Sequence, residues 1–116
     1  MLGKLLARFR RRGVIVPGTE ALAEGEARKV DVGDPLAGGV QVLLCRVGGK
    51  VHALDSLCPH EGGRIQPGPL IEGRIAVCPL HNYKFDVRDG KPVEGVCAAA
   101  RTYRVLERDG ECEVFV

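Results

Sequence analysis

The sequence from Cys58 to His81 reads CPHEGGRIQPGPLIEGRIAVCPLH and contains two short clusters of metal-ligating side chains. The first cluster is Cys58 and His60, with one residue between them. The second is Cys78 and His81, with two residues between them, and seventeen residues separate the two clusters. Proline and glycine accompany both clusters, which predicts two loops that each present one thiol and one imidazole. Such loops can bring all four side chains to one inorganic centre.

Two kinds of metal centre use two cysteines and two histidines. Tetrahedral zinc is one of them, but zinc fingers group their ligands as a cysteine pair and a histidine pair. The other is a [2Fe–2S] cluster of the variant in which two imidazoles replace two thiolates on one iron. The presence of one cysteine and one histidine in each loop favours the cluster. A zinc-stabilised interaction module stays as a remote alternative.

The ligand pattern, C-x-H followed after seventeen residues by C-x-x-H, resembles that of the Rieske iron–sulfur proteins. Gly62-Gly63 follow the first cluster, where a loop must wrap closely around the ligands. Tyr83-Lys84-Phe85-Asp86 and Asp89-Gly90 follow the second cluster, as in many Rieske-type ferredoxins. The resemblance covers roughly residues 14–116.

This resemblance implies the role of each ligand. Cys58 and Cys78 would hold one iron of the [2Fe–2S] cluster, while His60 and His81 would hold the other. The histidine side would lie near the surface, where electrons enter and leave. A proline-containing loop shields the cluster in this family, and Pro92 is our candidate for that role.

The composition predicts an all-β fold. Glycine and proline are abundant, with 16 and 7 among 116 residues, which favours short strands joined by tight turns. By the resemblance, we expect residues 14–116 to form a Rieske-like antiparallel β sandwich or barrel with two cluster-binding loops. Strands are predicted at 14–16, 27–32, 40–47, 51–54, 70–71, 74–77, 83–87, 102–107 and 111–116. Tight turns are predicted at Gly48-Gly49, Glu72-Gly73, Asp89-Gly90 and Asp109-Gly110.

Residues 1–13 differ from the rest of the chain. Leu2, Leu5, Leu6 and Phe9 lie at helical spacing, and the first twelve residues hold five basic side chains and no acidic one. A short amphipathic helix that ends at Gly13 is therefore predicted. Two roles are open for this helix. It covers its own domain, or it docks on an acidic partner or an anionic membrane surface.

Charge and hydropathy exclude several classes of protein. The residues after position 12 carry a net charge of −3, which argues against a nucleic-acid partner. No stretch approaches the ~18 consecutive apolar residues of a membrane helix. Only Val14-Ile15-Val16 separates Arg10-Arg11-Arg12 from Pro17, and this is too short for the apolar part of an export signal. We therefore expect a cytoplasmic protein.

A Rieske centre has four protein ligands and no open coordination position, so it carries one electron and binds no substrate at iron. An oxygenase would need a further iron held by two histidines and a carboxylate, and His52 is the only histidine left over. We expect a ferredoxin between a flavin- or NAD(P)H-linked reductase and an oxygenase or other acceptor. It would not be catalytic alone.

One alternative remains within the same family. The sequence from His81 to Asp86, Asp89-Gly90, and Cys97 ahead of Thr102-Tyr103 resemble the small subunit of NAD(P)H-dependent assimilatory nitrite reductase. The partner would then be the large subunit of that enzyme. Cys45, Cys97 and Cys112 are expected to be buried packing residues without a role in chemistry.

The resemblance also implies a low reduction potential. High-potential Rieske proteins have a disulfide between their ligand loops, and the matching positions here are Gly63 and Leu80. Those proteins also place serine and tyrosine hydroxyls beside the cluster, where this chain has Tyr83 and Phe85. Fewer hydrogen-bond donors leave the reduced cluster less stabilised. The expected potential is therefore at the low end of the Rieske range, roughly −150 to 0 mV.

Overall fold

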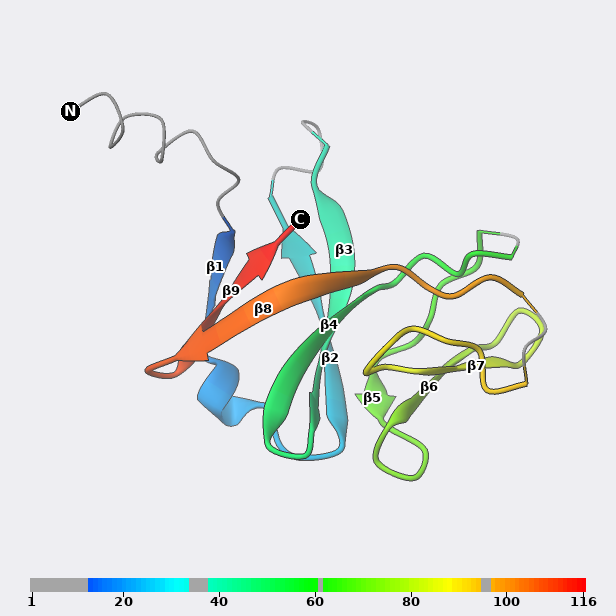
Figure 1. Ribbon diagram of the computed structural model, residues 1–116, viewed down its shortest axis with the longest axis horizontal. Coiled ribbons are helices and arrows are strands. Elements are labelled where there is room, and N and C mark those ends of the chain that lie inside the picture. Colours follow the sequence, from blue (N-terminus) through cyan, green and yellow to red (C-terminus); the bar gives the residue numbers. More distant parts are fainter. Residues whose placement is uncertain (1–12, 34–37, 61, 95–96) are drawn as a thin grey trace.

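The computed structural model describes residues 13–33, 38–60, 62–94 and 97–116 (Figure 1). The expected helix at 1–13 lies, apart from Gly13, outside the described residues. The strands are β1 (Val14–Pro17), β2 (Glu26–Val32), β3 (Val40–Val47), β4 (Lys50–Asp55), β5 (Gly68–Pro69), β6 (Ile75–Cys78), β7 (Tyr83–Asp86), β8 (Thr102–Arg108) and β9 (Glu111–Phe115). The described ranges contain no α-helix, only the 3-10 turn η1 (Thr19–Ala21). The prediction of an all-β protein is confirmed.

The strands form two antiparallel sheets. Seven of them make one curled sheet in the order β1-β9-β8-β4-β3-β2-β5, and β6 and β7 make a separate hairpin. Figure 1 shows this hairpin at the right of the view, on the opposite side from β1 and β9. Within the described ranges, no helix is long and apolar enough to cross a membrane.

Two of the predicted turns are confirmed as hairpins. Gly48-Gly49 connects β3 to β4, and Asp109-Gly110 connects β8 to β9. All four residues have positive φ, from 52° to 80°, as a two-residue turn that matches the twist of the strands requires. Glycine and aspartate tolerate this backbone conformation better than bulkier side chains.

The expected hairpin around Glu72-Gly73 is confirmed as a tight turn closed by one antiparallel pair, but not as two paired strands. The turn itself is present, but only an isolated bridge between Ile71 and Ile75 accompanies it. The backbone N–H of Leu70 donates instead to the carbonyl of Gly25, 2.8 Å away, beside the main sheet. The strand that begins at Ile75 pairs with β7, so the second ligand loop becomes the turn of the β6-β7 hairpin.

Strand β3 is buried on both faces and divides the hydrophobic interior into two cores. On one face, Val42 and Leu44 belong to a set that we call the body core. On the other, Leu43 and Cys45 belong to the site core. The body core comprises Val16, Leu22, Val32, Val42, Leu44, Val51, Ala53, Cys112 and Val114. The site core comprises Ala27, Leu43, Cys45, Leu54, Cys58, Ile65, Leu70, Ala76, Cys78, Phe85, Val87 and Ala100.

This double burial explains the uninterrupted apolar run of β3. Successive side chains of a strand point to opposite faces, so a strand with only one buried face would alternate apolar and polar residues. Each fully buried valine or leucine contributes roughly 1.5–3 kcal/mol. Within this run, Val42 and Leu44 therefore pack in the body core. Leu43 and Cys45 pack in the site core, which also contains Cys58 and Cys78.

Candidate metal centre

The first ligand loop leaves the end of β4 and is shaped by its own backbone. The N–H of Cys58 donates to the carbonyl of Gly63 at 2.7 Å, and the N–H of Ile65 donates to the carbonyl of Ser56 at 2.7 Å. Asp55 adds a side-chain contact, because its Oδ1 accepts a hydrogen bond from the N–H of Leu57 at 2.9 Å. These bonds close the first ligand loop between Ser56 and Ile65, and the Cys58 side chain lies in the site core.

The second ligand loop is the tight connection of the β6-β7 hairpin. Cys78 is the last residue of β6 and pairs directly with Tyr83, the first residue of β7. The four residues between them make the turn, and Asn82 has a φ of 58°, a conformation that asparagine tolerates well. This geometry leaves Cys78 buried in the hairpin and places His81 in the exposed turn.

The two loops approach each other most closely at Gly63. A Cβ atom at this position would lie 2.7 Å from the Sγ of Cys78 and 3.2 Å from the Cβ of Leu80. Any side chain there would push the second loop away from the first. Gly63 is therefore required for the two loops to meet.

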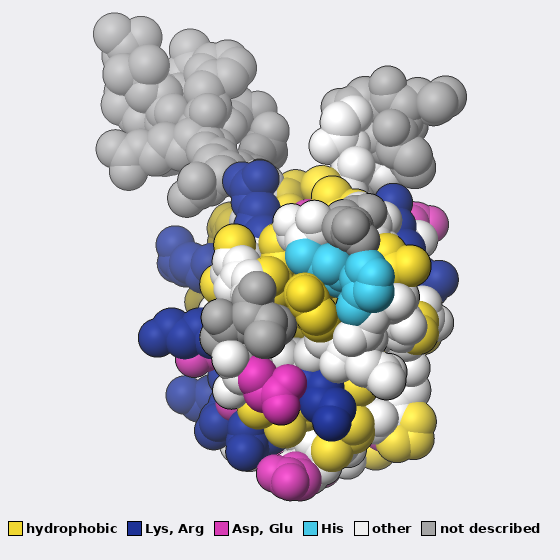
Figure 2. Space-filling view, turned by 90° about the vertical axis from the view of Figure 1, so that its right-hand side faces the viewer, with side chains coloured by type: hydrophobic (Ala, Val, Ile, Leu, Met, Phe, Trp, Pro, Cys, Tyr) yellow, Lys and Arg dark blue, Asp and Glu magenta, His cyan; other side chains and the backbone are white. Residues whose placement is uncertain are grey.

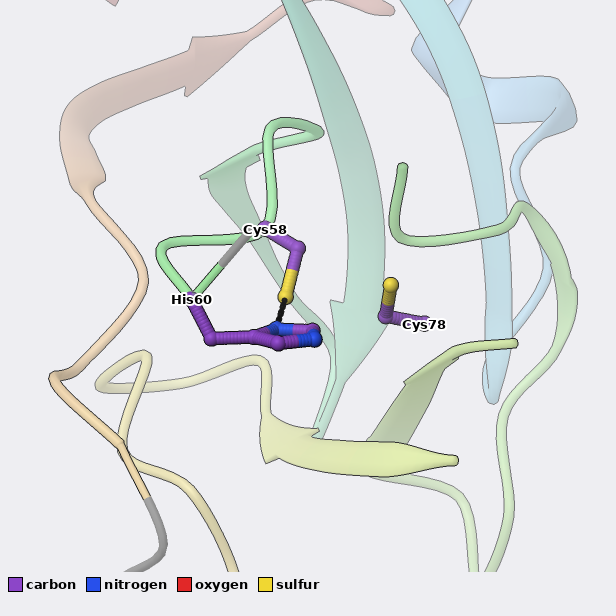
Figure 3. Close-up of side chains that lie close together, drawn as sticks. All are labelled: Cys58, His60 and Cys78. Carbon is purple, nitrogen blue, oxygen red and sulfur yellow. Dashed lines mark hydrogen bonds between the residues drawn. The ribbon is translucent and has the colours of Figure 1, made fainter. Parts of the chain in front are cut away.

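The structure brings the four predicted side chains together. The Sγ of Cys58 lies 2.5 Å from the Nδ1 of His60, and the Nε2 of His60 lies 2.9 Å from the Nδ1 of His81. The possible ligand atoms of Cys58, His60 and Cys78 all lie within 4.8 Å of one another (Figure 3). Three of the four predicted ligands therefore form one group, and His81 adjoins it through His60. Their assignment as cluster ligands stays a prediction.

The thiols and the imidazoles face different surroundings. Cys58 and Cys78 are 1% and 0% exposed, whereas His60 is half-buried and His81 is exposed. The expected surface position of the histidines is confirmed for His81 and, in part, for His60. Figure 2 shows the histidine side chains as a surface patch with hydrophobic side chains beside it.

This donor set fits a [2Fe–2S] cluster of the mixed type. Two sulfur donors and one imidazole lie within 4.8 Å of one another, the second imidazole lies beside the first, and Gly63 keeps the space beside Cys78 clear of a side chain. Burial, and after it the neighbouring thiol of Cys78, raises the pKa of Cys58 to about 11. Such a thiol ionises readily only next to a positive centre, and iron provides one.

An aromatic side chain also lies at this site. The ring of Tyr83 packs on the imidazole of His60 with 4.0 Å between ring centroids, and 5.9 Å separate it from His81. Sequence reasoning considered Tyr83 only as a hydrogen-bond donor and missed these ring contacts. Two positions further on, Phe85 is fully buried in the site core. Phe85 therefore packs in the site core and has no hydroxyl group that could donate a hydrogen bond.

The segment after β7 does not place its residues as expected. Pro92, our candidate shield, lies opposite Phe85 in an isolated bridge, and no described contact joins it to a ligand side chain. Its shielding role stays a prediction. Cys97, expected to be buried, is only half-buried and packs against the site core. Burial and the nearby thiol of Cys78 raise the pKa of Cys97.

Two further cysteines and the third histidine lie on strands of the main sheet. Cys45 and Cys112 are 0% and 1% exposed, which confirms that they are packing residues. His52 is half-buried in β4 and pairs across the sheet with Cys45. Its pKa is lowered, mainly by burial. The prediction that His52 takes no part in the centre agrees with this position.

The chain is similar to known proteins over most of its length. The Rieske [2Fe-2S] domain family matches residues 13–106. The ferredoxin component of the naphthalene 1,2-dioxygenase system of Pseudomonas putida is 40% identical over 72 residues, which cover 62% of this chain and 68% of that protein.

Solved structures agree with this match. The ferredoxin of carbazole 1,9a-dioxygenase from Nocardioides aromaticivorans superposes with a TM-score of 0.71 at 29% identity, covering 90% of this chain and 97% of the other. A structure described as a nitrite reductase small subunit from Mycobacterium tuberculosis shares the fold, with a TM-score of 0.63 at 23% identity over 87% of this chain and 91% of the other. The donor set, the curled sheet with its ligand hairpin and the match over residues 13–106 lead to one conclusion: this chain belongs to the Rieske [2Fe–2S] domain family.

Proposed function

We propose that this protein is a ferredoxin that delivers electrons to an oxygenase, and that its cluster is held by four side chains. Cys58 and Cys78 ligate one iron, and His60 and His81 ligate the other. The observation that carries this proposal is the group formed by Cys58, His60 and Cys78, with His81 in contact with His60. When bound, the [2Fe–2S] cluster accepts and releases a single electron.

The surroundings of the four side chains support electron transfer to another protein. The thiol side is enclosed by the site core, which excludes water from the sulfur ligands. The imidazole side reaches the surface, where Leu80, the residue before His81 in the exposed turn, is 51% exposed. Exposed apolar side chains near a functional site are typical of protein-binding surfaces. Electrons would therefore cross at the histidine side.

The partners follow from the relatives. A ferredoxin component of a dioxygenase system is 40% identical, so we propose an oxygenase as acceptor and a flavin- or NAD(P)H-linked reductase as donor. All five cysteines are free in the structure, as in proteins of a reducing compartment. We therefore propose a cytoplasmic location. Residues 14–116 would form the Rieske domain, and residues 1–13 a separate basic segment.

Metal and sulfide analysis of the purified protein tests the ligand assignment. We expect about two irons and two acid-labile sulfides per chain, as a [2Fe–2S] centre requires. The visible spectrum, recorded anaerobically, should change on reduction and recover on oxidation. Stoichiometric zinc without labile sulfide would contradict the assignment and would favour a zinc-stabilised module.

The proposed low potential has its own test. Phe85 has no hydroxyl, the described contacts of Tyr83 are ring contacts, and Gly63 and Leu80 stand at the positions of the missing disulfide. Protein-film voltammetry near neutral pH should give a midpoint of roughly −150 to 0 mV. A midpoint above about +100 mV, well away from the low end of the family range, would contradict this.

A second candidate, the small subunit of a nitrite reductase, is favoured by the sequence from His81 to Asp86 and by the segment from Cys97 to Tyr103. The two candidates differ in how tightly they bind their partners. A carrier exchanges partners and purifies alone, whereas a subunit stays bound to its large subunit. Co-purification with a reductase of stable stoichiometry would favour the subunit.

A further inference from the structure

Tyr83 links the two ligand loops. Its backbone belongs to the second loop, because Tyr83 pairs with Cys78 at the closed end of the β6-β7 hairpin. Its ring, however, packs on His60, which belongs to the first loop, at a centroid distance of 4.0 Å. The same ring lies 5.9 Å from His81. One side chain therefore contacts both imidazoles, which are 21 residues apart in sequence.

The two imidazoles need such support more than the two thiols do. Cys58 and Cys78 are almost completely buried, so close packing fixes their side-chain rotamers. His60 is half-buried and His81 is exposed, so close packing restricts these side chains less than it restricts the two thiols. An exposed imidazole can turn away from the metal centre unless another group holds it, and outer contacts commonly orient ligating histidines.

The arrangement of the rings indicates how Tyr83 acts. The planes of Tyr83 and His60 are inclined by 37°, and those of Tyr83 and His81 by 47°, so both contacts are tilted ring contacts. Contacts of this kind depend on the aromatic ring and not on the hydroxyl group. A phenylalanine could therefore make them, but an aliphatic side chain of similar size could not.

We propose that Tyr83 is a positioning residue whose ring holds the imidazoles of His60 and His81 in the orientation in which they ligate iron. This inference rests on the ligand roles proposed above. It adds that the geometry of the histidine side depends on an aromatic ring at position 83. The hydroxyl of Tyr83 takes no part in this role.

Three variants distinguish the effect of the Tyr83 ring from the effect of its hydroxyl group and from a general effect of substitution in β7. Tyr83→Leu removes the ring and keeps an apolar side chain, and Tyr83→Phe removes the hydroxyl alone. Lys84→Ala is the matched control, because Lys84 is the next residue of β7 and its exposed side chain points to the opposite face. Circular dichroism of each variant checks that the β fold is retained.

The readouts are cluster retention and the spectroscopy of the iron site. We expect Tyr83→Leu to lose iron to a chelator roughly two- to tenfold faster than the unmodified protein, as aromatic pair energies imply. Its reduced form should show altered EPR g values and histidine nitrogen couplings. Tyr83→Phe and Lys84→Ala should match the unmodified protein in both readouts.

The possible failures are distinguishable. Unmodified protein without iron and labile sulfide would overturn the ligand roles, and this inference with them. If the unmodified protein holds its cluster and Tyr83→Leu shows the same EPR signal and iron loss, the ligand roles stand and the role of Tyr83 is wrong. If Tyr83→Phe behaves like Tyr83→Leu, the hydroxyl is needed and the ring argument fails.

Discussion

The body core and the site core share strand β3 but are stabilised in different ways. The body core is built mostly from branched aliphatic side chains on strands joined by ordinary hairpins. The site core contains two of the proposed ligands, Cys58 and Cys78, and includes residues outside the strands, such as Ile65, Val87 and Ala100. Apolar burial suffices for the body core. The site core also buries two thiols that are proposed to bind iron.

This difference indicates that the main sheet can stay folded when the metal centre is lost. Leu43 faces the site core and Leu44 the body core, so each face of β3 is packed independently of the other. Damage to the ligand loops should remove the cofactor and leave the main sheet folded. Damage to the body core should lower the stability of the whole domain, because β3 supports both cores.

Substitution of a cysteine in each core gives the largest contrast. Cys78→Ser should abolish cluster binding, because the variant loses a thiolate of the proposed iron site, while the far-UV circular dichroism stays that of a β protein. Iron and sulfide assays together with the visible spectrum measure this.

Cys112→Ser is the matched substitution in the body core, where Cys112 is 1% exposed. It should cost about 1–3 kcal/mol of unfolding free energy, because it buries a hydroxyl, and it should keep a full complement of iron. Retention of the cluster by Cys78→Ser would contradict the ligand assignment.

A glycine pair gives the next contrast. In Gly63→Ala the added Cβ would lie 2.7 Å from the Sγ of Cys78, so the loops must separate. We expect well under half the normal iron content, with little change in the thermal unfolding of the main sheet. Gly48→Ala meets no atom within 4 Å but has a φ of +63°. It should cost about 1 kcal/mol of stability and leave the iron content unchanged.

Acid should weaken the β6-β7 hairpin through Asp86. Two arginines hold this carboxylate, with Arg88 Nη2 at 2.7 Å and Arg74 Nη1 at 3.0 Å from its Oδ2. Arg88 is the main cause that lowers the pKa of Asp86 from 3.8 to about 2. The ion pairs therefore stabilise the folded state above about pH 4, and this stabilisation is lost as the pH falls toward 2.

Replacing the carboxylate should mimic the effect of acid at neutral pH. Asp86→Asn should lower the free energy of unfolding by about 1 kcal/mol at pH 7 and flatten its dependence on pH below 4. Thermal unfolding between pH 3 and pH 7 measures both. Glu72→Gln, which removes an exposed partner of Arg74, is the control and should change little. An equal acid sensitivity in Asp86→Asn would contradict the role of Asp86.

Removal of residues 1–12 should have the smallest effect on the centre. These residues precede the region that matches the family and carry five basic side chains. We expect an unchanged visible spectrum and slower electron transfer to the partner at low salt, where electrostatic steering is strongest. Stopped-flow reduction at several ionic strengths measures this. Loss of the cluster in the truncated protein would show that the segment belongs to the fold.

The sequence alone predicted the ligand set, and it determined the class of fold and two of the hairpins. Cysteine and histidine pairs at fixed short spacing indicate a metal centre whatever the surrounding fold, because ligand chemistry is local. Gly48-Gly49 and Asp109-Gly110 identify their turns for a similar reason, since a positive φ is a property of single residues. The apolar run of β3 likewise predicted a strand.

Tertiary structure decided which strands pair and which side chains meet. Strand β6 pairs along its length with β7, whereas residues 70–71 meet it only in the bridge between Ile71 and Ile75. Leu70 instead donates its hydrogen bond to Gly25 beside the main sheet. The need for glycine at position 63 depends on the distance to Cys78 in the other loop. The contact between Tyr83 and His60 joins residues 23 positions apart, and local propensity carries no information on such a pair. Spacing along the chain fixes which groups are available, whereas packing between loops fixes how they are held.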